Sequence, residues 1–210
     1  MKGLFITFEG PDGSGKTTIS KRVQEALIER GYDAIYTREP GGIDIAEQIR
    51  NVILDPNNTA MDSKTEALLY AASRRQHLVE KVLPALEKGQ IIICDRFIDS
   101  SLAYQGYARH IGIEKVYDIN QFAIEGHFPD LTVFLNLDYE KGLERLEDRA
   151  FKDRLDLESK NFHKEVSLGY QKVMEKYQYR MNIVDASQPV DQVFEDALQI
   201  VLEKIRCMNN

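Results

Sequence analysis

The sequence predicts an α/β fold in which a five-stranded parallel sheet carries helices on both faces. Short apolar runs recur five times along the chain, and longer segments with helical periodicity separate them. Strands buried on both faces form continuous apolar runs, and parallel neighbours need long, usually helical, connections. With 210 residues the chain can bury one sizeable core, so we expect a single domain over residues 1–210.

The elements alternate in a regular order. The strands are short runs rich in β-branched and aromatic residues, expected at 4–9, 34–37, 91–94, 131–137 and 182–185. The helices have apolar residues every three or four positions, expected at 16–30, 43–54, 62–87, 99–108, 114–126, 139–149, 157–180 and 190–206. A glycine-rich turn precedes the first helix and Pro40-Gly41-Gly42 precedes the second, while Asp99 and Ser100 are suitable caps for the helix at 99–108.

Composition excludes several classes of protein. The formal net charge of −7 gives no general attraction for nucleic acids or anionic membranes, so we expect neither as a partner. Only Cys94 and Cys207 are present, which argues against a disulfide framework and favours a reducing compartment. No apolar run approaches the ~20 residues of a transmembrane helix. We expect a soluble cytoplasmic protein.

The most specific motif is a complete G-x-x-x-x-G-K-[ST] sequence at residues 10–17, between a predicted strand and a predicted helix. In that context its backbone N–H groups converge on phosphate oxygens, Lys16 reaches the terminal phosphates and the Thr17 hydroxyl binds Mg²⁺. The fold class is therefore the P-loop NTPase type. The expected nucleotide site comprises Gly10, Pro11, Asp12, Gly13, Ser14, Gly15, Lys16, Thr17 and Thr18. Asp12 faces the acceptor or the metal, unless it is a solvent-exposed turn residue.

The third strand ends in Asp95-Arg96. An acid at the tip of the strand beside the phosphate loop can hold the metal through water. The adjacent cation indicates a second phosphate-bearing ligand or charge that develops during reaction, with a surface ion pair as the alternative. Arg38, in "TREPGG", and Arg50 can converge with Arg96 on one phosphate, although each alone is typical of a solvated arginine.

Two further segments are suited to binding a base. Tyr70 and Arg74 are spaced i, i+4, so one helical face can stack a planar base on the ring and donate hydrogen bonds to its edge. A buried tyrosine beside a surface arginine is the alternative. After the third strand, "DSSLAYQGYAR" supplies hydroxyl and amide groups that suit a base edge, from Ser100, Ser101, Tyr104 and Gln105.

Taken in order, these segments resemble bacterial thymidylate kinase, a nucleoside monophosphate kinase. The motifs that carry the resemblance span nearly the whole chain: "FEGPDGSGKTT", "TREPGG", "EALLYAASRRQH", "CDRFIDSSLAYQG", "PDLTVFLNL" and "DRAFKDRLD". The resemblance implies transfer of the γ-phosphoryl group of MgATP to dTMP, giving dTDP and ADP in dTTP synthesis. It also implies a homodimer, formed through helices around 43–54, 62–80 and 99–124.

The resemblance implies a role for each matched residue. Arg38, Arg50 and Arg96 grip the dTMP phosphate. Tyr70 stacks on thymine in a position that is commonly Phe. Arg74 and Gln105 donate to the base edge, with Ser100 and Ser101 nearby. Tyr104 crowds the sugar 2′ position, Asp12 lies near the 3′-OH, and "DASQP" at 185–189 borders adenine. The peptide bond between Arg96 and Phe97 is expected to be cis.

One branch of the family uses an arginine directly after the loop aspartate as a catalytic cation, and here that residue is Gly13. The resemblance therefore places the cation in a mobile lid at about 142–156. We expect Arg149 and Arg154 at the phosphates and Arg145 near adenine. The expected catalytic set is Asp12, Lys16, Arg96, Arg149 and Arg154.

Two other functions remain open from the residues alone. A kinase acting on another nucleotide or deoxynucleoside has the same loop, but the arginines at 38, 50 and 96 favour an acceptor that already carries phosphate. A nucleotide-driven switch would hydrolyse ATP slowly and would have no use for the face formed by Tyr70 and Arg74.

Overall fold

In the computed structural model, residues 3–147 and 152–209 are described. Within these residues an all-parallel sheet has the strand order β2-β3-β1-β4-β5. The strands are β1 Leu4–Glu9, β2 Ala34–Arg38, β3 Ile91–Asp95, β4 Leu131–Asn136 and β5 Met181–Asp185. Each lies within one residue of its predicted bounds, and the predicted fold class is confirmed.

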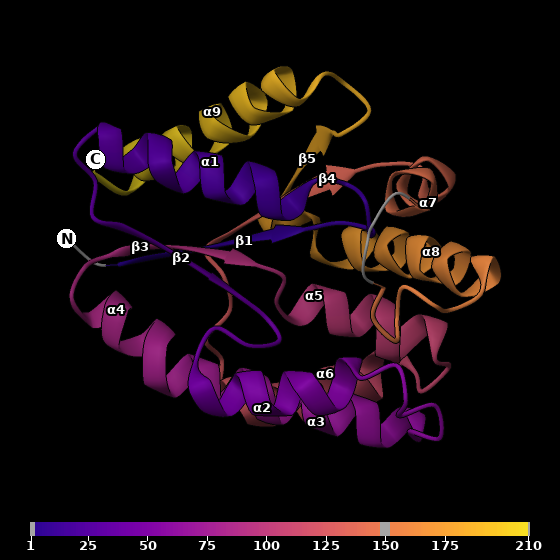
Figure 1. Cartoon of the computed structure of the whole chain (residues 1–210). Helices are drawn as coiled ribbons and strands as arrows, with labels where there is room; N and C mark the ends of the chain where they lie inside the picture. The colour runs from indigo at the N-terminus through magenta and orange to yellow at the C-terminus, as the bar shows by residue number, and fades with distance from the viewer. Residues whose placement is uncertain (1–2, 148–151, 210) are drawn as a thin grey trace.

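Helices cover both faces of the sheet (Figure 1). One face carries α1 Lys16–Glu29 and α9 Val190–Asn209. The opposite face carries α2 Asp44–Leu54, α3 Ser63–His77, α4 Leu83–Glu87, α5 Ile98–Ser101 and α6 Ile113–Ile124. Beyond the carboxyl ends of the strands lie α7 Tyr139–Glu147 and α8 Lys160–Tyr177. Among the described helices, none combines the length and apolar character that crossing a lipid bilayer requires.

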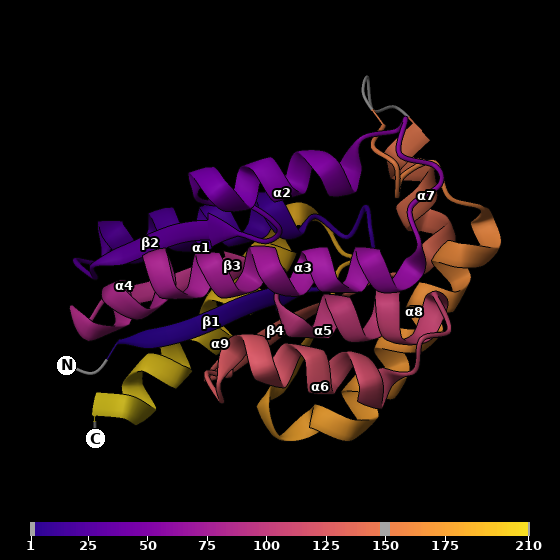
Figure 2. The same ribbon diagram turned by 90° about the horizontal axis from the view of Figure 1, so that it is seen from below.

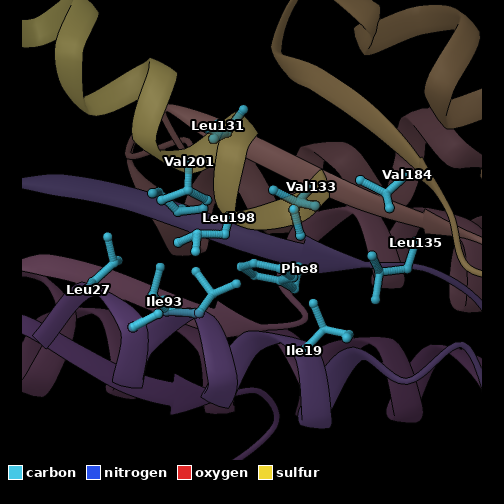
Figure 3. Close-up of a cluster of buried hydrophobic side chains, with 14 of the residues drawn as sticks. Phe8, Ile19, Leu27, Ile93, Leu131, Val133, Leu135, Val184, Leu198 and Val201 are labelled. Atoms are coloured by element: carbon cyan, nitrogen blue, oxygen red, sulfur yellow. The ribbon is translucent and has the colours of Figure 1, made fainter. Parts of the chain in front are cut away.

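The alternation of side chains along the strands explains why both faces are covered. In β1, Leu4, Ile6 and Phe8 pack into the core under α1 and α9, whereas Phe5 packs into the core on the opposite face. Figure 3 shows the first of these cores, with Phe8 and Ile93 between the sheet and α1. Because strands with two apolar faces must be buried on both sides, the sheet requires helices on each face.

Two predicted helices change their hydrogen-bonding pattern partway. The segment predicted at 62–87 runs from α3 through the π-helical η1 Leu78–Val82 into α4. Pro84 has no N–H group to donate, and the ladder changes register just before it. The segment predicted at 99–108 passes from α5 into the π-helical η2 Leu102–Ala108. π-Helical turns are frequent at functional sites, and η2 carries two predicted site residues.

The prediction of a cis peptide bond between Arg96 and Phe97 was wrong. In the described residues the cis bond joins Glu39 to Pro40, and proline is the residue for which the cis form costs little. Arg96 is unusual in another way, because it has a left-handed backbone with a φ angle of 70°.

Candidate active site

A cavity of about 330 Å³ lies at the carboxyl ends of the strands, where ligands bind in open parallel sheets. Its wall is drawn from the loop after β1, the ends of β2 and β3, and helices α2, α3, η2 and α7. The predicted residues that line it are Asp12, Gly13, Gly15, Lys16, Thr17, Thr18, Arg38, Arg50, Tyr70, Asp95, Arg96, Ser100, Tyr104, Gln105 and Arg145. Segments that are far apart in the sequence therefore meet in one space.

The glycines of the phosphate loop are required for different reasons. A side chain at Gly10 would place its Cβ 2.5 Å from the Leu135 carbonyl oxygen, so glycine lets the loop lie against β4. Gly15 has open space around it but a φ angle of 87°, so its need for glycine is conformational. It precedes the first residue of α1, and the amino end of that helix therefore faces the cavity.

Lys16 is almost completely buried within the loop. Its Nζ donates to the Pro11 carbonyl oxygen at 2.8 Å, which holds the ammonium group inside the curve of the backbone. Burial and the neighbouring Arg96 lower the pKa of Lys16 to about 8, although Asp12 and Asp95 act in the opposite direction. The side chain is therefore a cation at neutral pH, but it loses its proton more readily than an exposed lysine does.

Thr17 and Asp95 form the position suited to a metal ion. The Thr17 hydroxyl donates to Asp95 Oδ2 at 2.5 Å, and both residues line the cavity. Among the described residues, no cluster of three or more His, Cys, Asp or Glu side chains could form an all-protein metal site. A hydroxyl and one carboxylate fit Mg²⁺, which takes few protein ligands and completes its shell with water and phosphate oxygens.

Arg96 joins the phosphate loop to the opposite wall of the cavity. Its guanidinium pairs with Asp12 and donates to Ser100 Oγ at 3.0 Å and to the Tyr170 hydroxyl at 3.1 Å. The Tyr104 hydroxyl donates to the second oxygen of Asp12 at 2.5 Å. Burial alone would raise the pKa of Asp12, but Arg96 and Lys16 lower it to about 2. Asp12 is therefore ionised and in direct contact with Arg96.

Glu9 is a site residue that the sequence analysis missed. Its buried carboxylate accepts the Phe97 N–H at 2.7 Å and the Ser100 hydroxyl at 2.6 Å. Burial and the nearby Asp99 raise its pKa to about 7, although Ser100 and Arg96 act in the opposite direction. These contacts fix the backbone that follows Arg96. The sequence did contain a sign of this role, because Glu9 is an acidic residue at the end of the otherwise apolar strand "LFITFE".

Arg38 and Arg50 are neighbours and both line the cavity. Arg38 pairs with both carboxylate oxygens of Glu47, at 2.8 and 3.0 Å, and Arg50 donates to the Pro40 carbonyl oxygen at 2.9 Å. Burial and the neighbouring Arg38 lower the pKa of Arg50. Two guanidinium groups that repel each other beside a cavity favour an anion between them.

Arg74 and Ser101 are buried beside lining residues and are not themselves among the residues that line the cavity. Arg74 is 1% exposed, and its guanidinium donates to Glu39 at 2.7 Å, to Ser101 at 3.0 Å and to Asn120. Glu39 also contacts His77 Nδ1 at 2.9 Å. Arg74 is therefore held rigidly by a buried network, which sequence spacing alone did not predict. Within the described chain its Nη2 makes no hydrogen bond and is not one of the fully enclosed unpartnered atoms.

The three lid arginines have different positions. Arg145 donates to the Gly13 carbonyl oxygen at 3.2 Å and to the Ala186 carbonyl oxygen at 3.3 Å, so it joins the phosphate loop to the segment after β5. Arg154, expected at the phosphates, is instead buried: it donates to Ile53 O at 2.7 Å and pairs with Glu66 at 2.5 Å, because these two acceptors satisfy its guanidinium. Arg149 lies outside the described residues.

The helix that begins the predicted lid packs directly on the phosphate loop. A Cβ at Gly13 would lie 2.3 Å from the Gly142 carbonyl oxygen, and a Cβ at Gly142 would lie 2.3 Å from the Asp12 carbonyl oxygen. The backbones of α7 and the loop therefore touch, and neither position has room for a side chain.

Comparisons with known proteins agree with this geometry. The family model described as thymidylate kinase matches residues 8–197. The chain belongs to the thymidylate kinase family. It is 58% identical to thymidylate kinase of Bacillus velezensis over 98% of both chains, and 59% identical to that of Clostridium novyi over 93% of this chain and 96% of the relative.

A solved thymidylate kinase, from Ehrlichia chaffeensis, has the same fold. It superposes with a TM-score of 0.77 at 32% identity, covering 96% of this chain and 99% of that one. Membership of the thymidylate kinase family makes this protein a phosphotransferase that uses ATP as donor, and the family's reaction is phosphoryl transfer to dTMP.

The depressed pKa of Lys16 predicts a pH limit on ATP use. Below about pH 8 the side chain is a cation that attracts phosphate, and above it the charge is lost. We expect kcat/KM for ATP to fall about tenfold per pH unit on the alkaline side, since this ratio reports ionisations of the free enzyme. Bound phosphates stabilise the ammonium form of Lys16, so kcat should begin to fall at a higher pH than kcat/KM does. Steady-state rates across the alkaline range test this, and a flat kcat/KM up to about pH 10 would contradict it.

Proposed function

We propose that the cavity holds dTMP and the reacting end of MgATP together, and that it transfers the γ-phosphoryl group to the dTMP phosphate, giving dTDP and ADP for dTTP synthesis. One observation carries the proposal. The phosphate loop and a second set of arginines, Arg38, Arg50 and Arg96, line the same cavity. A hydrolase needs only the loop, whereas a phosphorylated acceptor requires the second set.

The donor is proposed to bind along the phosphate loop. Backbone N–H groups and the amino end of α1 receive the phosphates, and Lys16 turns from the Pro11 carbonyl oxygen toward the terminal phosphate. Thr17 and Asp95 would hold Mg²⁺, which would neutralise phosphate charge when bound. Arg145, which contacts Gly13 and Ala186, is suited to the adenine side.

The acceptor is proposed to place its phosphate among Arg38, Arg50 and Arg96. A dTMP phosphate oxygen then attacks the γ-phosphorus in line, and the bond from that phosphorus to the β-bridging oxygen breaks, leaving ADP. The loose transition state needs alignment and positive charge rather than a strong base. Arg96 and Lys16 supply that charge, and Arg149 remains the proposed contributor from the lid at about 142–156, since Arg154 is buried against Glu66.

The nucleoside is proposed to lie between Tyr70 and the wall formed by η2. Thymine stacks on the Tyr70 ring and Gln105 meets its N3, since both residues line the cavity. Arg74, whose Nη2 makes no hydrogen bond within the described residues, donates to O4. Ser101 supports Arg74, and Ser100 supports Arg96. Tyr104 and Asp12, linked by a hydrogen bond of 2.5 Å, face the sugar.

A homodimer in the cytoplasm is the proposed state of the enzyme. The side chains that support it are apolar and exposed on neighbouring helices: Ile45 and Val52 on α2, Leu68 on α3 and Phe122 on α6. Figure 2 shows these three helices side by side on one side of the molecule. Contiguous exposed apolar surface is typical of a protein–protein interface.

An acceptor panel tests the proposed reaction. With MgATP, ADP release should be fast with dTMP, weaker with dUMP and close to background with dCMP, dGMP, thymidine or no acceptor. Thymine and uracil differ by one methyl group, which is worth only about 1–3 kcal/mol in a binding pocket. Slow ADP release that is the same with every acceptor would replace the kinase proposal with an ATPase switch.

Substitution of Arg50 tests the second phosphate site. Arg50→Ala should raise the KM for dTMP by about 10- to 100-fold, because a hydrogen bond to a charged group contributes about 1.5–3 kcal/mol. The KM for ATP should change little. Arg206→Ala, an exposed arginine on α9, is the matched control. Equal effects of Arg50→Ala on both KM values would argue against a dedicated acceptor site.

Sedimentation equilibrium tests the homodimer. The wild-type protein should have twice its chain mass of 24.1 kDa. Leu68→Glu, which puts a charge on the apolar surface of α3, should shift it to the monomer, since an unpaired buried charge is costly. Ile28→Glu, at a side chain that is 50% exposed on α1, is the control and should leave the mass unchanged. A wild-type monomer at micromolar concentration would refute the dimer.

A further inference from the structure

Glu66 is a buried acid that no step of the proposed reaction uses. It lies on α3 one turn before Tyr70 and is 1% exposed, so its charge must be compensated within the protein. Three side chains provide this compensation: Gln105 donates to Oε1 at 2.8 Å, Arg154 donates to Oε2 at 2.5 Å, and Arg109 donates to Oε2 at 3.2 Å.

These donors keep Glu66 ionised. Burial alone would raise the pKa of Glu66, but the hydrogen bond from Gln105 and the two arginines bring it below the usual value. An ionised carboxylate only accepts hydrogen bonds, whereas a side-chain amide donates through nitrogen and accepts through oxygen. The group that Gln105 presents to Glu66 must therefore be its NH₂, and this assignment follows from the charge of the partner.

The orientation of the amide determines what Gln105 presents to the cavity. With Nε2 directed at Glu66, the carbonyl oxygen Oε1 is on the other side of the amide group. Gln105 lines the cavity together with Tyr70. Within the described residues Oε1 accepts no hydrogen bond, and it is not one of the fully enclosed unpartnered atoms. A ligand that hydrogen-bonds to Gln105 from the cavity would therefore meet an acceptor, rather than the donor expected from the sequence.

We propose that Glu66 is a positioning residue for base selection, which fixes the Gln105 amide with its oxygen toward the base and so admits a pyrimidine with N3–H. The inference rests on the proposed function, because it takes dTMP as the occupant. Thymine and uracil carry a hydrogen on N3, whereas N3 of cytosine is an acceptor. Two acceptors facing each other repel, so the fixed amide disfavours dCMP.

The test compares nucleotide selectivity in Glu66→Gln with that of the wild type. A neutral amide at position 66 can donate as well as accept, so the Gln105 amide is free to turn and donate to N3 of cytosine. The ratio of kcat/KM for dTMP to that for dCMP should fall about tenfold or more, because hydrogen-bonded sites discriminate strongly. The ratio for dTMP to dUMP should stay the same, since both bases have N3–H.

A swapped pair and a control complete the experiment. In the double variant E66Q/Q105E, the new amide at position 66 donates to the new carboxylate at position 105. The second oxygen of that carboxylate again faces the base, so selectivity should return toward that of the wild type. Arg109→Gln removes one ion pair from Glu66 without touching the amide, and it should leave the dTMP to dCMP ratio unchanged. A purely structural role of Glu66 would lower activity toward all nucleotides together.

The outcomes separate the two proposals. If folded Glu66→Gln keeps the wild-type ratio, or if Arg109→Gln changes it equally, the positioning role is wrong. If thermal unfolding shows that Glu66→Gln does not fold, the double variant E66Q/Q105E tests the inference instead. A double variant that does not prefer dTMP over dCMP would overturn it. A wild-type enzyme that is inactive with dTMP in the same assay would instead refute the proposed function.

Discussion

The site depends on how Arg96 is held. The residue directly follows β3 and has a left-handed backbone, which is uncommon for a residue with a side chain. Glu9 holds the backbone that follows it by accepting the Phe97 N–H at 2.7 Å, and Asp12 pairs with its guanidinium. The direction of the arginine is thus set by two acids from β1 and the loop after it. This one side chain thereby links the phosphate loop to Ser100 and Tyr170.

Buried acids have a common task around the cavity. Glu9, Glu39 and Glu66 are each at most 4% exposed, and each accepts hydrogen bonds from a group that faces or supports a ligand position. A buried acid that is fully hydrogen-bonded is rigid, because any rotation would leave buried polar groups without partners. The polar side chains around the cavity are thereby oriented before a ligand arrives, which lowers the entropy cost of binding.

The sequence predicted the parallel sheet, the order of strands and helices along the chain, and the site residues that a motif or a strand end places. Lys16, Asp95 and Arg96 belong to this group, because a motif or a strand end determines their position. It did not reach partners that come from distant helices, such as Glu66 with Gln105 and Arg154, since helix periodicity does not say which helices meet. It placed Arg154 at the phosphates because the local pattern gave no sign of its buried acceptors.

The contact between Gly13 and Gly142 links two positions that are far apart in the sequence. A side chain at Gly13 would occupy the position of the Gly142 backbone, and a side chain at Gly142 would occupy that of the Asp12 carbonyl group, so α7 and the phosphate loop pack as a single unit. A related chain with an arginine at position 13 has to seat the helix equivalent to α7 farther from the phosphate loop. The phosphate loop therefore cannot both carry an arginine at position 13 and pack against α7 as it does here. The size of the residue at position 13 decides whether the loop or another part of the molecule can supply the catalytic cation.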